Sequence, residues 1–250
     1  MTEPKIFYVR SISPLLLLIR RRLMFIAERG RLIPTGLFFL FFSLVSVILF
    51  AKGSFTLDAS LVDAAEKKYG AAARERLLAW QQLIRDDGST TDLQKLENVN
   101  IFFNRINFVS DAIHWQKTDY WATPLEFLAS DGGDCEDFAL AKYFTLKLLG
   151  VADEKMNITY VKAWKIKQAH MVLTYYETPG AVPLVLDNLV TAIEPANKRP
   201  DLLPVYSFNG SGLWLSKERG RGNPVGKSDR LKLWNDLLER MPAGFGAVIK

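Results

Sequence analysis

Cysteine and histidine are both scarce in this sequence, which has one cysteine and two histidines among 250 residues. A single cysteine excludes an internal disulfide and the multi-cysteine zinc sites of small metal-binding domains. Any thiol chemistry must therefore use Cys135. The alternative to a chemical role for Cys135 is that it is buried and packs as a small hydrophobic side chain. The chain also shows no internal repeat and no low-complexity tract.

An excess of positive charge is present only near the N-terminus. The chain carries a formal net charge of +5, from 32 Lys and Arg against 27 Asp and Glu. Residues 1–51 contain seven of the basic and two of the acidic residues, which leaves 25 of each sign in the rest. The remainder is neutral, so charge gives no support for nucleic-acid binding.

The N-terminal region has the layout of an export signal or a membrane anchor. Residues 37–51 form an uncharged apolar run that follows a group of arginines: Arg20, Arg21, Arg22, Arg29 and Arg31. Small residues near Ala51 suit a signal peptidase, whereas counting from Leu32 gives a run long enough to span a bilayer. Met24 is an alternative start. We predict an N-terminal segment at 1–53, a domain at 54–250 and a periplasmic location.

The only cysteine lies in the motif GGDCEDFALAKYF at residues 132–144. The paired glycines allow a sharp turn, and an apolar helical pattern follows. Cys135 is therefore expected in the first turn of a helix, where free N–H groups and the helix dipole favour a thiolate. Its acidic neighbours oppose a thiolate by like-charge repulsion: Asp134, Glu136 and Asp137. This conflict is the first indication of a bound cation.

Hydrophobic periodicity predicts helices before the cysteine helix and strands after it. Helices are expected at 58–85 with a break at Gly70, at 92–113, from Thr123-Pro124, and at 229–240. Strands are expected at 158–164, 170–176 and 183–187, then near 205–208 and 213–216, with a basic glycine-rich loop at 217–227. This order predicts an α+β fold, with a helical layer that includes the cysteine helix packed on an antiparallel β-sheet.

A cysteine nucleophile needs a base and usually a third group that holds the base. His170 opens one predicted strand and Asp187 ends the next, so antiparallel pairing would bring them together. A cysteine at a helix start, facing a histidine and an acid on neighbouring strands, is the papain and transglutaminase geometry. On these residues alone, His170 is equally well a structural histidine, and Asp187 with Asn188 suits a turn.

The segment 114–130 places many aromatic side chains just before the cysteine. Three of them either pack in the core or form the wall of a cleft beside the cysteine: Trp115, Tyr120 and Trp121. His114 is most simply a histidine at a helix end. Gln116 is a candidate for the second oxyanion donor beside the Cys135 N–H.

Four motifs together resemble the bacterial transglutaminase-like cysteine proteinases: WATPLEFL at 121–128, GDCED at 133–137, AHMVL at 169–173 and LDN at 186–188. They occur in the family's order with compatible gaps, within a resemblance that covers about residues 61–240. The resemblance implies a papain/transglutaminase-like fold. It also implies Cys135 as the nucleophile, His170 as the general base and Asp187 as the group that orients the imidazole.

The same resemblance implies a Ca²⁺ site beside the cysteine. Asp134 and Glu136 are the implied ligands, and Asp137 is a further candidate. Carboxylate oxygens suit calcium. The cation would also neutralise the acids that oppose a thiolate.

The resemblance further implies a substrate and a regulator. Members of the family cut large calcium-binding surface adhesins near the N-terminus, after a pair of alanines, and so disperse biofilm. An inner-membrane receptor that senses cyclic di-GMP holds the protease inactive when the nucleotide is abundant. We therefore expect an exported, calcium-dependent cysteine endopeptidase. The alternatives are a transglutaminase or amidase with the same triad, and a catalytically silent module that docks on a membrane receptor, although an intact triad argues against the second.

Overall fold

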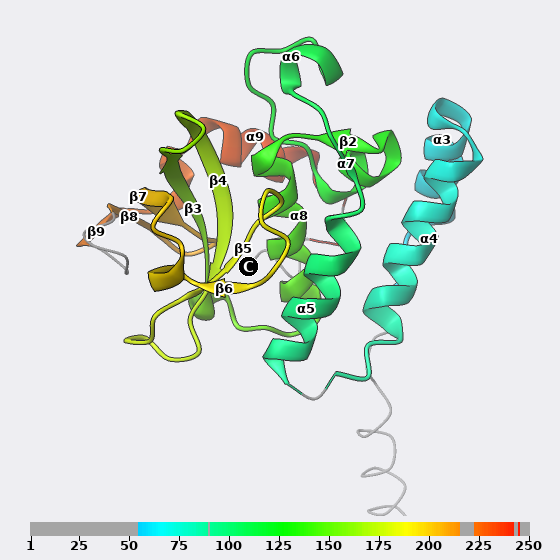
Figure 1. Ribbon diagram of the computed structural model, residues 1–250. Coiled ribbons are helices and arrows are strands. Elements are labelled where there is room, and N and C mark those ends of the chain that lie inside the picture. The colour runs from blue at the N-terminus through cyan, green and yellow to red at the C-terminus, as the bar shows by residue number, and fades with distance from the viewer. Residues whose placement is uncertain (1–54, 90, 216–222, 243–244, 246–250) are drawn as a thin grey trace, which may run out of the picture. The chain divides into compact units, whose positions relative to one another are not determined.

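The computed structural model describes residues 55–89, 91–215, 223–242 and 245 (Figure 1). The predicted signal or anchor segment at 1–53 lies outside the described residues. That segment and the boundary after it therefore stay predictions. Within the described part of the chain, no helix combines the length and the apolar character needed to cross a lipid bilayer.

The first half of the described chain is helical. Helices α3 (Ala59–Tyr69) and α4 (Ala71–Arg85) are separated by Gly70 at φ +88°, so the predicted break is confirmed. Helix α5 (Asp92–Phe103) starts after its N-cap Thr91. Helix α7 (Pro124–Ser130) opens with a capping box between Thr123 and Glu126, as the sequence predicts.

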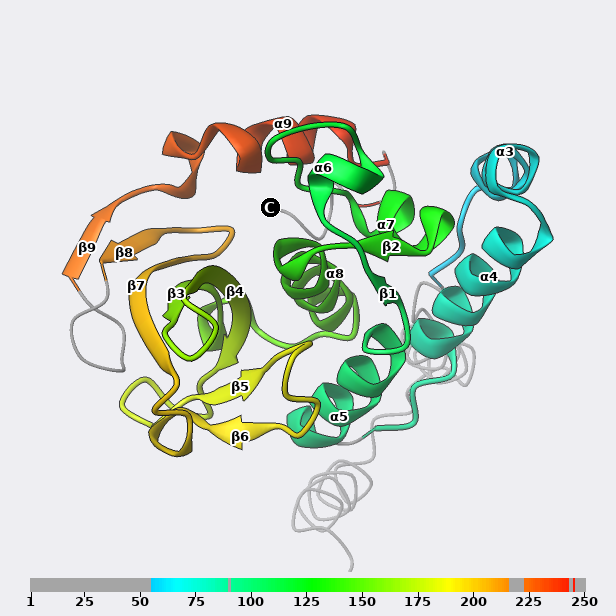
Figure 2. The same cartoon turned by 45° about the horizontal axis from the view of Figure 1, so that its top comes forward.

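Helix α8 (Cys135–Leu148) is the central element of the fold. All of its residues from 137 to 146 are buried. Figure 2 shows it between α5 and α7 on one side and the β-sheet on the other. A hydrogen bond of 2.9 Å from Trp80 Nε1 to Thr145 Oγ1 connects α4 to the last turn of α8. A helix that packs on several sides holds its first residue, Cys135, in a fixed position.

The second half forms a seven-stranded antiparallel sheet in the order β6-β5-β4-β3-β7-β8-β9. Its central strands are β3 (Met156–Ala163), β4 (Gln168–Tyr175) and β7 (Leu202–Phe208). The outer strands are β5 (Leu184–Leu186), β6 (Glu194–Pro195), β8 (Leu213–Leu215) and β9 (Asn223–Gly226). Helix α9 (Lys232–Arg240) follows a 3₁₀ turn, η3 (Ser228–Arg230).

The two faces of the sheet bury different clusters. Met171, Leu173 and Tyr175 of β4 belong to the main core with α8, whereas Val172 belongs to a smaller cluster with Val161. This is the period-two alternation of a strand. The predicted α+β order of elements is therefore present, with helices covering the main-core face.

The prediction of one helix over 92–113 was wrong. The helix ends at Phe103, and β1 (Asn107–Phe108) pairs in parallel with β2 (Gly132–Gly133) before the short helix α6 (Asp111–His114). Long-range backbone pairing overrides helical periodicity here, because the Val109 N–H also donates to the Gly133 carbonyl. Residues 223–226, predicted as part of a loop, form strand β9.

Candidate active site

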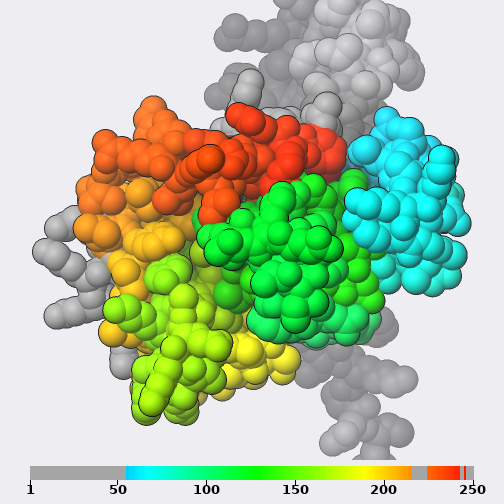
Figure 3. Space-filling model, turned by 90° about the horizontal axis from the view of Figure 1, so that it is seen from above, coloured from blue at the N-terminus to red at the C-terminus, as the bar shows by residue number. Residues whose placement is uncertain are grey.

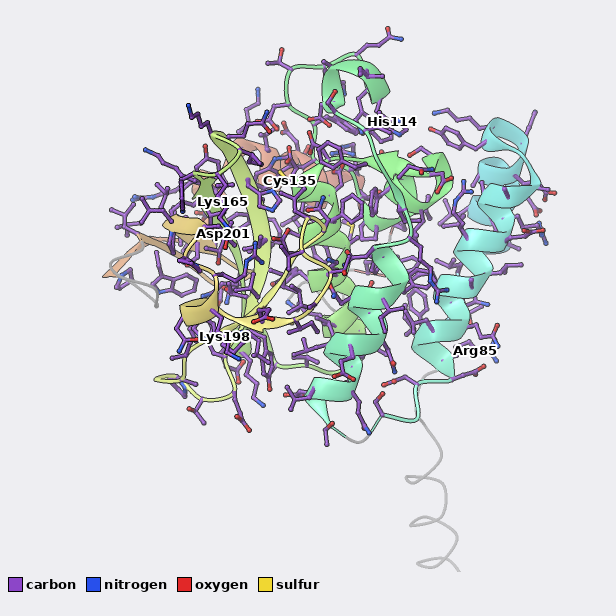
Figure 4. All side chains as sticks on the ribbon, in the orientation of Figure 1. Arg85, His114, Cys135, Lys165, Lys198 and Asp201 are labelled. Atoms are coloured by element: carbon purple, nitrogen blue, oxygen red, sulfur yellow. The ribbon has the colours of Figure 1, made fainter. Side chains whose placement is uncertain are left out.

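Cys135 is the first residue of α8, so it lies in the first turn as the sequence predicts, and Asp134 is the N-cap. Figure 4 places the label of Cys135 at the upper end of this helix, beside β4. The two positions before Asp134 require glycine, because side-chain atoms of other residues lie where a Cβ atom would be. A Cβ on Gly133 would lie 2.2 Å from Asp137 Oδ2, and one on Gly132 would lie 2.9 Å from His114 Cε1.

Asp137 fastens the start of the helix to the loop before it. Its Oδ1 accepts the Ala122 N–H at 2.7 Å, and its Oδ2 accepts the Asp134 N–H at 3.2 Å. Its side chain is buried, and burial raises the pKa of this carboxyl well above its usual value. These contacts give Asp137 a clear structural task, and its role as a metal ligand stays a prediction.

Four acidic side chains besides Asp137 gather near the cysteine: Asp111, Asp119, Asp134 and Glu136. Carboxylate oxygens of Asp111, Asp119 and Glu136 lie within 4.8 Å of one another, as do those of Asp111, Asp134 and Asp137. Asp111 and Asp119 were not predicted as site residues. They come from the segment 104–120, which was expected to be partly helical and instead folds over the start of α8.

The acidic cluster has little positive charge near it. Burial, and then the Asp134 charge, raise the pKa of Asp111 to about 6. Burial and Asp134 likewise raise the pKa of Glu136 to about 10. Asp111 Oδ1 and Asp134 Oδ1 are buried without a hydrogen-bond partner among the described residues. Crowded carboxylates with unpaired buried oxygens fit a hard divalent cation, for which such oxygens are the preferred ligands.

The thiol of Cys135 is held in its protonated form in this arrangement. Its Sγ donates to Glu136 Oε2 at 3.1 Å, and the Met171 N–H donates to the sulfur. Burial, followed by the Glu136 carboxylate, raises the pKa of the thiol above its usual value, and the Met171 contact lowers it. The residue that opposes the thiolate is therefore also a candidate metal ligand.

His170 and Asp187 meet as the sequence predicts. Strand β4 pairs with β5 up to Leu173 opposite Leu186, and just beyond that pair His170 Nε2 lies 2.8 Å from Asp187 Oδ1. Both side chains are buried. Burial raises the pKa of Asp187, but hydrogen bonds from His170 and Arg199 outweigh it and lower the pKa to about 2. Since Asp187 is ionised, Nε2 carries the proton and Nδ1 is left as an acceptor.

Cys135 and His170 line the same cleft, which has a volume of about 500 Å³. Three aromatic rings line it as well: Trp121, Tyr160 and Tyr206. Trp121 stacks on Phe208 at a ring distance of 5.4 Å. The cleft is therefore lined by a thiol, an imidazole that is hydrogen-bonded to a carboxylate, three acidic side chains (Asp119, Asp134 and Glu136) and an aromatic wall.

Comparisons with known proteins agree with this geometry. The family model described as bacterial transglutaminase-like cysteine proteinase matches residues 80–215. This chain belongs to that family. EGTA-treated LapG of Legionella pneumophila is 44% identical over 73% of this chain and 96% of its own, with a TM-score of 0.65. The calcium-bound structure of the same protein is 42% identical over 74% and 100%, with a TM-score of 0.63. The comparison with curated proteins gave no match.

Family membership confirms the predicted fold and enzyme class. The α+β arrangement is that of a transglutaminase-like cysteine proteinase. The roles of Cys135, His170 and Asp187 stay predictions.

The remaining sequence predictions near the cleft divide into those that line it and those that do not. Trp121 lines it. Tyr120 packs on Trp115 at a ring distance of 4.8 Å and donates to Glu126. His114 ends α6 and bonds Ser130 Oγ at 2.8 Å, as expected of a helix-end histidine. Gln116 is exposed, with φ +55°, and lies outside the cleft lining.

Helix α9 fixes the aromatic segment from outside. Arg240 donates to the Tyr120 hydroxyl and the Trp121 carbonyl, both at 2.6 Å, and pairs with Glu126. Figure 3 shows this helix, in red, against the green part of the chain that contains the segment. The C-terminal helix therefore positions one wall of the cleft, a link that spans more than a hundred residues and has no local sequence signal.

Proposed function

We propose that this chain is a calcium-dependent cysteine endopeptidase with Cys135, His170 and Asp187 as its catalytic triad. The observation that carries the proposal is the 2.8 Å contact between His170 Nε2 and Asp187 Oδ1, with the imidazole in the same cleft as the only thiol. A histidine held by an ionised acid, with its second nitrogen free, is what a thiol nucleophile requires.

The reaction follows from these positions. His170 Nδ1 takes the thiol proton, and the Cys135 sulfur attacks the scissile carbonyl carbon. The Cys135 N–H, free at the helix start, donates to the developing oxyanion. The leaving amine takes the proton from His170 as the thioester forms. A water molecule then gives its proton to His170 and attacks the thioester, which releases the second product and restores the thiol.

Ca²⁺ would be held by Asp134 and Glu136, together with Asp111 and Asp119. The unpaired buried oxygens of Asp111 and Asp134 support this set. When bound, the ion supplies positive charge that neutralises the carboxylates beside the thiol. Asp137 already accepts two backbone N–H groups, so in this proposal it supports the loop.

The proposed substrate is a large calcium-binding surface adhesin, cut near its N-terminus after a pair of alanines to control biofilm release. The proposed location is the periplasm, and the proposed regulator is an inner-membrane receptor that senses cyclic di-GMP. The support is membership of the family, together with 44% identity to LapG. A cleft walled by Trp121 and two tyrosines suits small side chains at the cleavage site.

The test is cleavage of an N-terminal fragment of such an adhesin by the full-length protein, followed by mass spectrometry of the products. Cleavage is expected with Ca²⁺. It should be lost in EGTA, regained when Ca²⁺ is restored, and absent in Cys135→Ala. Cleavage by the Cys135→Ala protein would overturn the proposal. Thiol-dependent transfer of a primary amine probe onto glutamine, without cleavage, would favour the transglutaminase alternative.

A further inference from the structure

The carboxylate of Asp187 has more partners than the histidine alone. Its side chain is fully buried. Oδ1 accepts His170 Nε2 at 2.8 Å and the Leu189 N–H at 3.0 Å. Oδ2 accepts Arg199 Nη2 at 2.7 Å. Both oxygens are therefore occupied, and each by a different set of donors.

Arg199 reaches Asp187 from the segment between β6 and β7. It follows the short 3₁₀ turn η2 (Ala196–Lys198) and is only 5% exposed. Its Nη2 also donates to Asp201 at 2.8 Å, and its Nε donates to the same carboxylate at 3.1 Å. A buried guanidinium is costly unless it is paired. Here two carboxylates share it, so Asp187 keeps a full negative charge for the imidazole.

We propose that Arg199 is a positioning residue for the reaction and fixes the rotation of the Asp187 carboxylate so that Oδ1 faces His170. The inference rests on the proposed function of the triad. A carboxylate turns about its Cβ–Cγ bond unless its two oxygens have different partners. The planar fork of arginine holds one oxygen in a set direction, which an ammonium group does not do.

The backbone of Asp187 is anchored independently of Arg199. Its carbonyl accepts Lys142 Nζ at 3.1 Å and Asn104 Nδ2 at 2.9 Å. These donors come from α8 and the end of α5, on the other side of the residue. Loss of the guanidinium therefore leaves the main chain of Asp187 in place. The effect of an Arg199 variant is expected in the carboxylate and in the imidazole that it orients.

The role of Arg199 can be tested without the natural substrate, because the chain has one cysteine and two histidines. Because the chain has one cysteine, the rate of alkylation by iodoacetamide reports on Cys135 alone. Because it has two histidines, ¹⁵N signals of labelled imidazoles are few, and those of His170 are identified by their loss in His170→Ala. Both measurements use the full-length protein with Ca²⁺ present.

The variants are Arg199→Gln, Arg199→Lys and a matched control, Arg76→Gln. Arg76 is a partly buried arginine that donates to the Leu128 and Ala129 carbonyls and has no contact with Asp187. Arg199→Gln is expected to slow alkylation roughly 10-fold, the lower range for loss of a residue that orients a functional side chain. Its His170 signals should change from one tautomer to a mixture. Arg199→Lys should recover part of the rate, and Arg76→Gln should match the wild type in both measurements.

The outcomes separate this inference from the proposed function. Wild-type alkylation and an unchanged tautomer in Arg199→Gln would overturn the role of Arg199. If His170→Ala does not slow alkylation, the triad itself is wrong. If Arg199→Gln fails to fold, Arg199→Lys carries the test, and a wild-type rate with a single tautomer would overturn the need for the guanidinium fork.

Discussion

The two sides of the cleft differ in how completely the protein supplies hydrogen-bond donors and opposite charge to their carboxylates. On the His170–Asp187 side, both carboxylate oxygens have donors, and the positive charge of Arg199 lies beside them. On the Cys135 side, four carboxylates gather, two of their oxygens are buried without a partner, and Glu136 holds the thiol proton. The proposed base, His170, thus has its partners from the protein alone, while the proposed nucleophile, Cys135, lies beside carboxylates whose charge an added cation would offset.

This difference follows from where the charges come from. Asp187 receives its donors from three separate parts of the chain: β4, the loop after β5, and the β6–β7 connection. The acids beside Cys135 contact mainly one another, backbone N–H groups and the Cys135 thiol. We therefore expect variants on the His170 side to change the reactivity of the site whether or not Ca²⁺ is present. Variants on the Cys135 side are expected to change it through weaker binding of Ca²⁺.

The largest effect is expected from Asp187→Asn. The amide cannot hold the imidazole in the tautomer that leaves Nδ1 free, and a comparable change in a serine protease triad costs roughly 10⁴-fold in kcat. The cleavage rate with saturating Ca²⁺ checks this. Asp201→Asn, in the same charged group but without contact to His170, is the control. A rate for Asp187→Asn within 10-fold of the wild type would contradict the assignment.

The acidic half is tested by Glu136→Gln. With Ca²⁺, the variant should bind the ion more weakly, because a charged ligand is lost. Isothermal titration calorimetry measures this. In EGTA at pH 8, a Glu136 pKa of about 10 leaves the carboxyl protonated, so the variant removes no charge and Cys135 should be alkylated at close to the wild-type rate. The variant should therefore differ from the wild type only when Ca²⁺ is present. A changed alkylation rate in EGTA would contradict this expectation.

When Ca²⁺ is removed by EGTA, the free energy of unfolding is expected to fall as the pH rises. The pKa of Asp111 is raised to about 6 and that of Glu136 to about 10, so the folded state binds more protons than the unfolded chain above about pH 4. Their favourable contribution is present below that pH and is lost through about pH 6 for Asp111, and up to about pH 10 for Glu136. Urea unfolding at pH 5 and pH 8, with EGTA and with Ca²⁺, measures this. The stabilisation by Ca²⁺ should be larger at pH 8, and equal stabilisation at both pH values would contradict the cation site.

The last prediction concerns Lys142, a fully buried lysine about two turns after Cys135 on α8. Burial lowers its pKa to about 7, an effect that the Asp187 charge partly opposes. Between about pH 7 and pH 10.5 the unfolded chain therefore binds the extra proton, and stability rises with pH by up to roughly 1.4 kcal/mol per unit. The wild-type slope should exceed that of Lys142→Met in urea unfolding over this range. Parallel slopes would show that Lys142 stays charged in the fold.

The sequence was informative where structure is local. The paired glycines, the acids and the apolar pattern after Cys135 predicted this cysteine at a helix start, and α8 does begin at that residue. Alternating strands predicted that His170 and Asp187 would be neighbours, and they share a hydrogen bond. The N-cap at Thr123 and the break at Gly70 were correct for the same reason, since each depends on residues a few positions apart.

The tertiary structure alone decided the rest. Asp111 and Asp119 join the acidic cluster because β1 pairs with β2 and ends α5 early, which no helical period could indicate. Arg199 and Lys142 reach Asp187 from 12 and 45 residues away in the chain. The physical reason is common to all four residues. The start of a helix, or the pairing of two strands joined by a short turn, is determined by residues that are close together in the sequence. The charges around a buried group depend instead on which distant segments the packed core brings together.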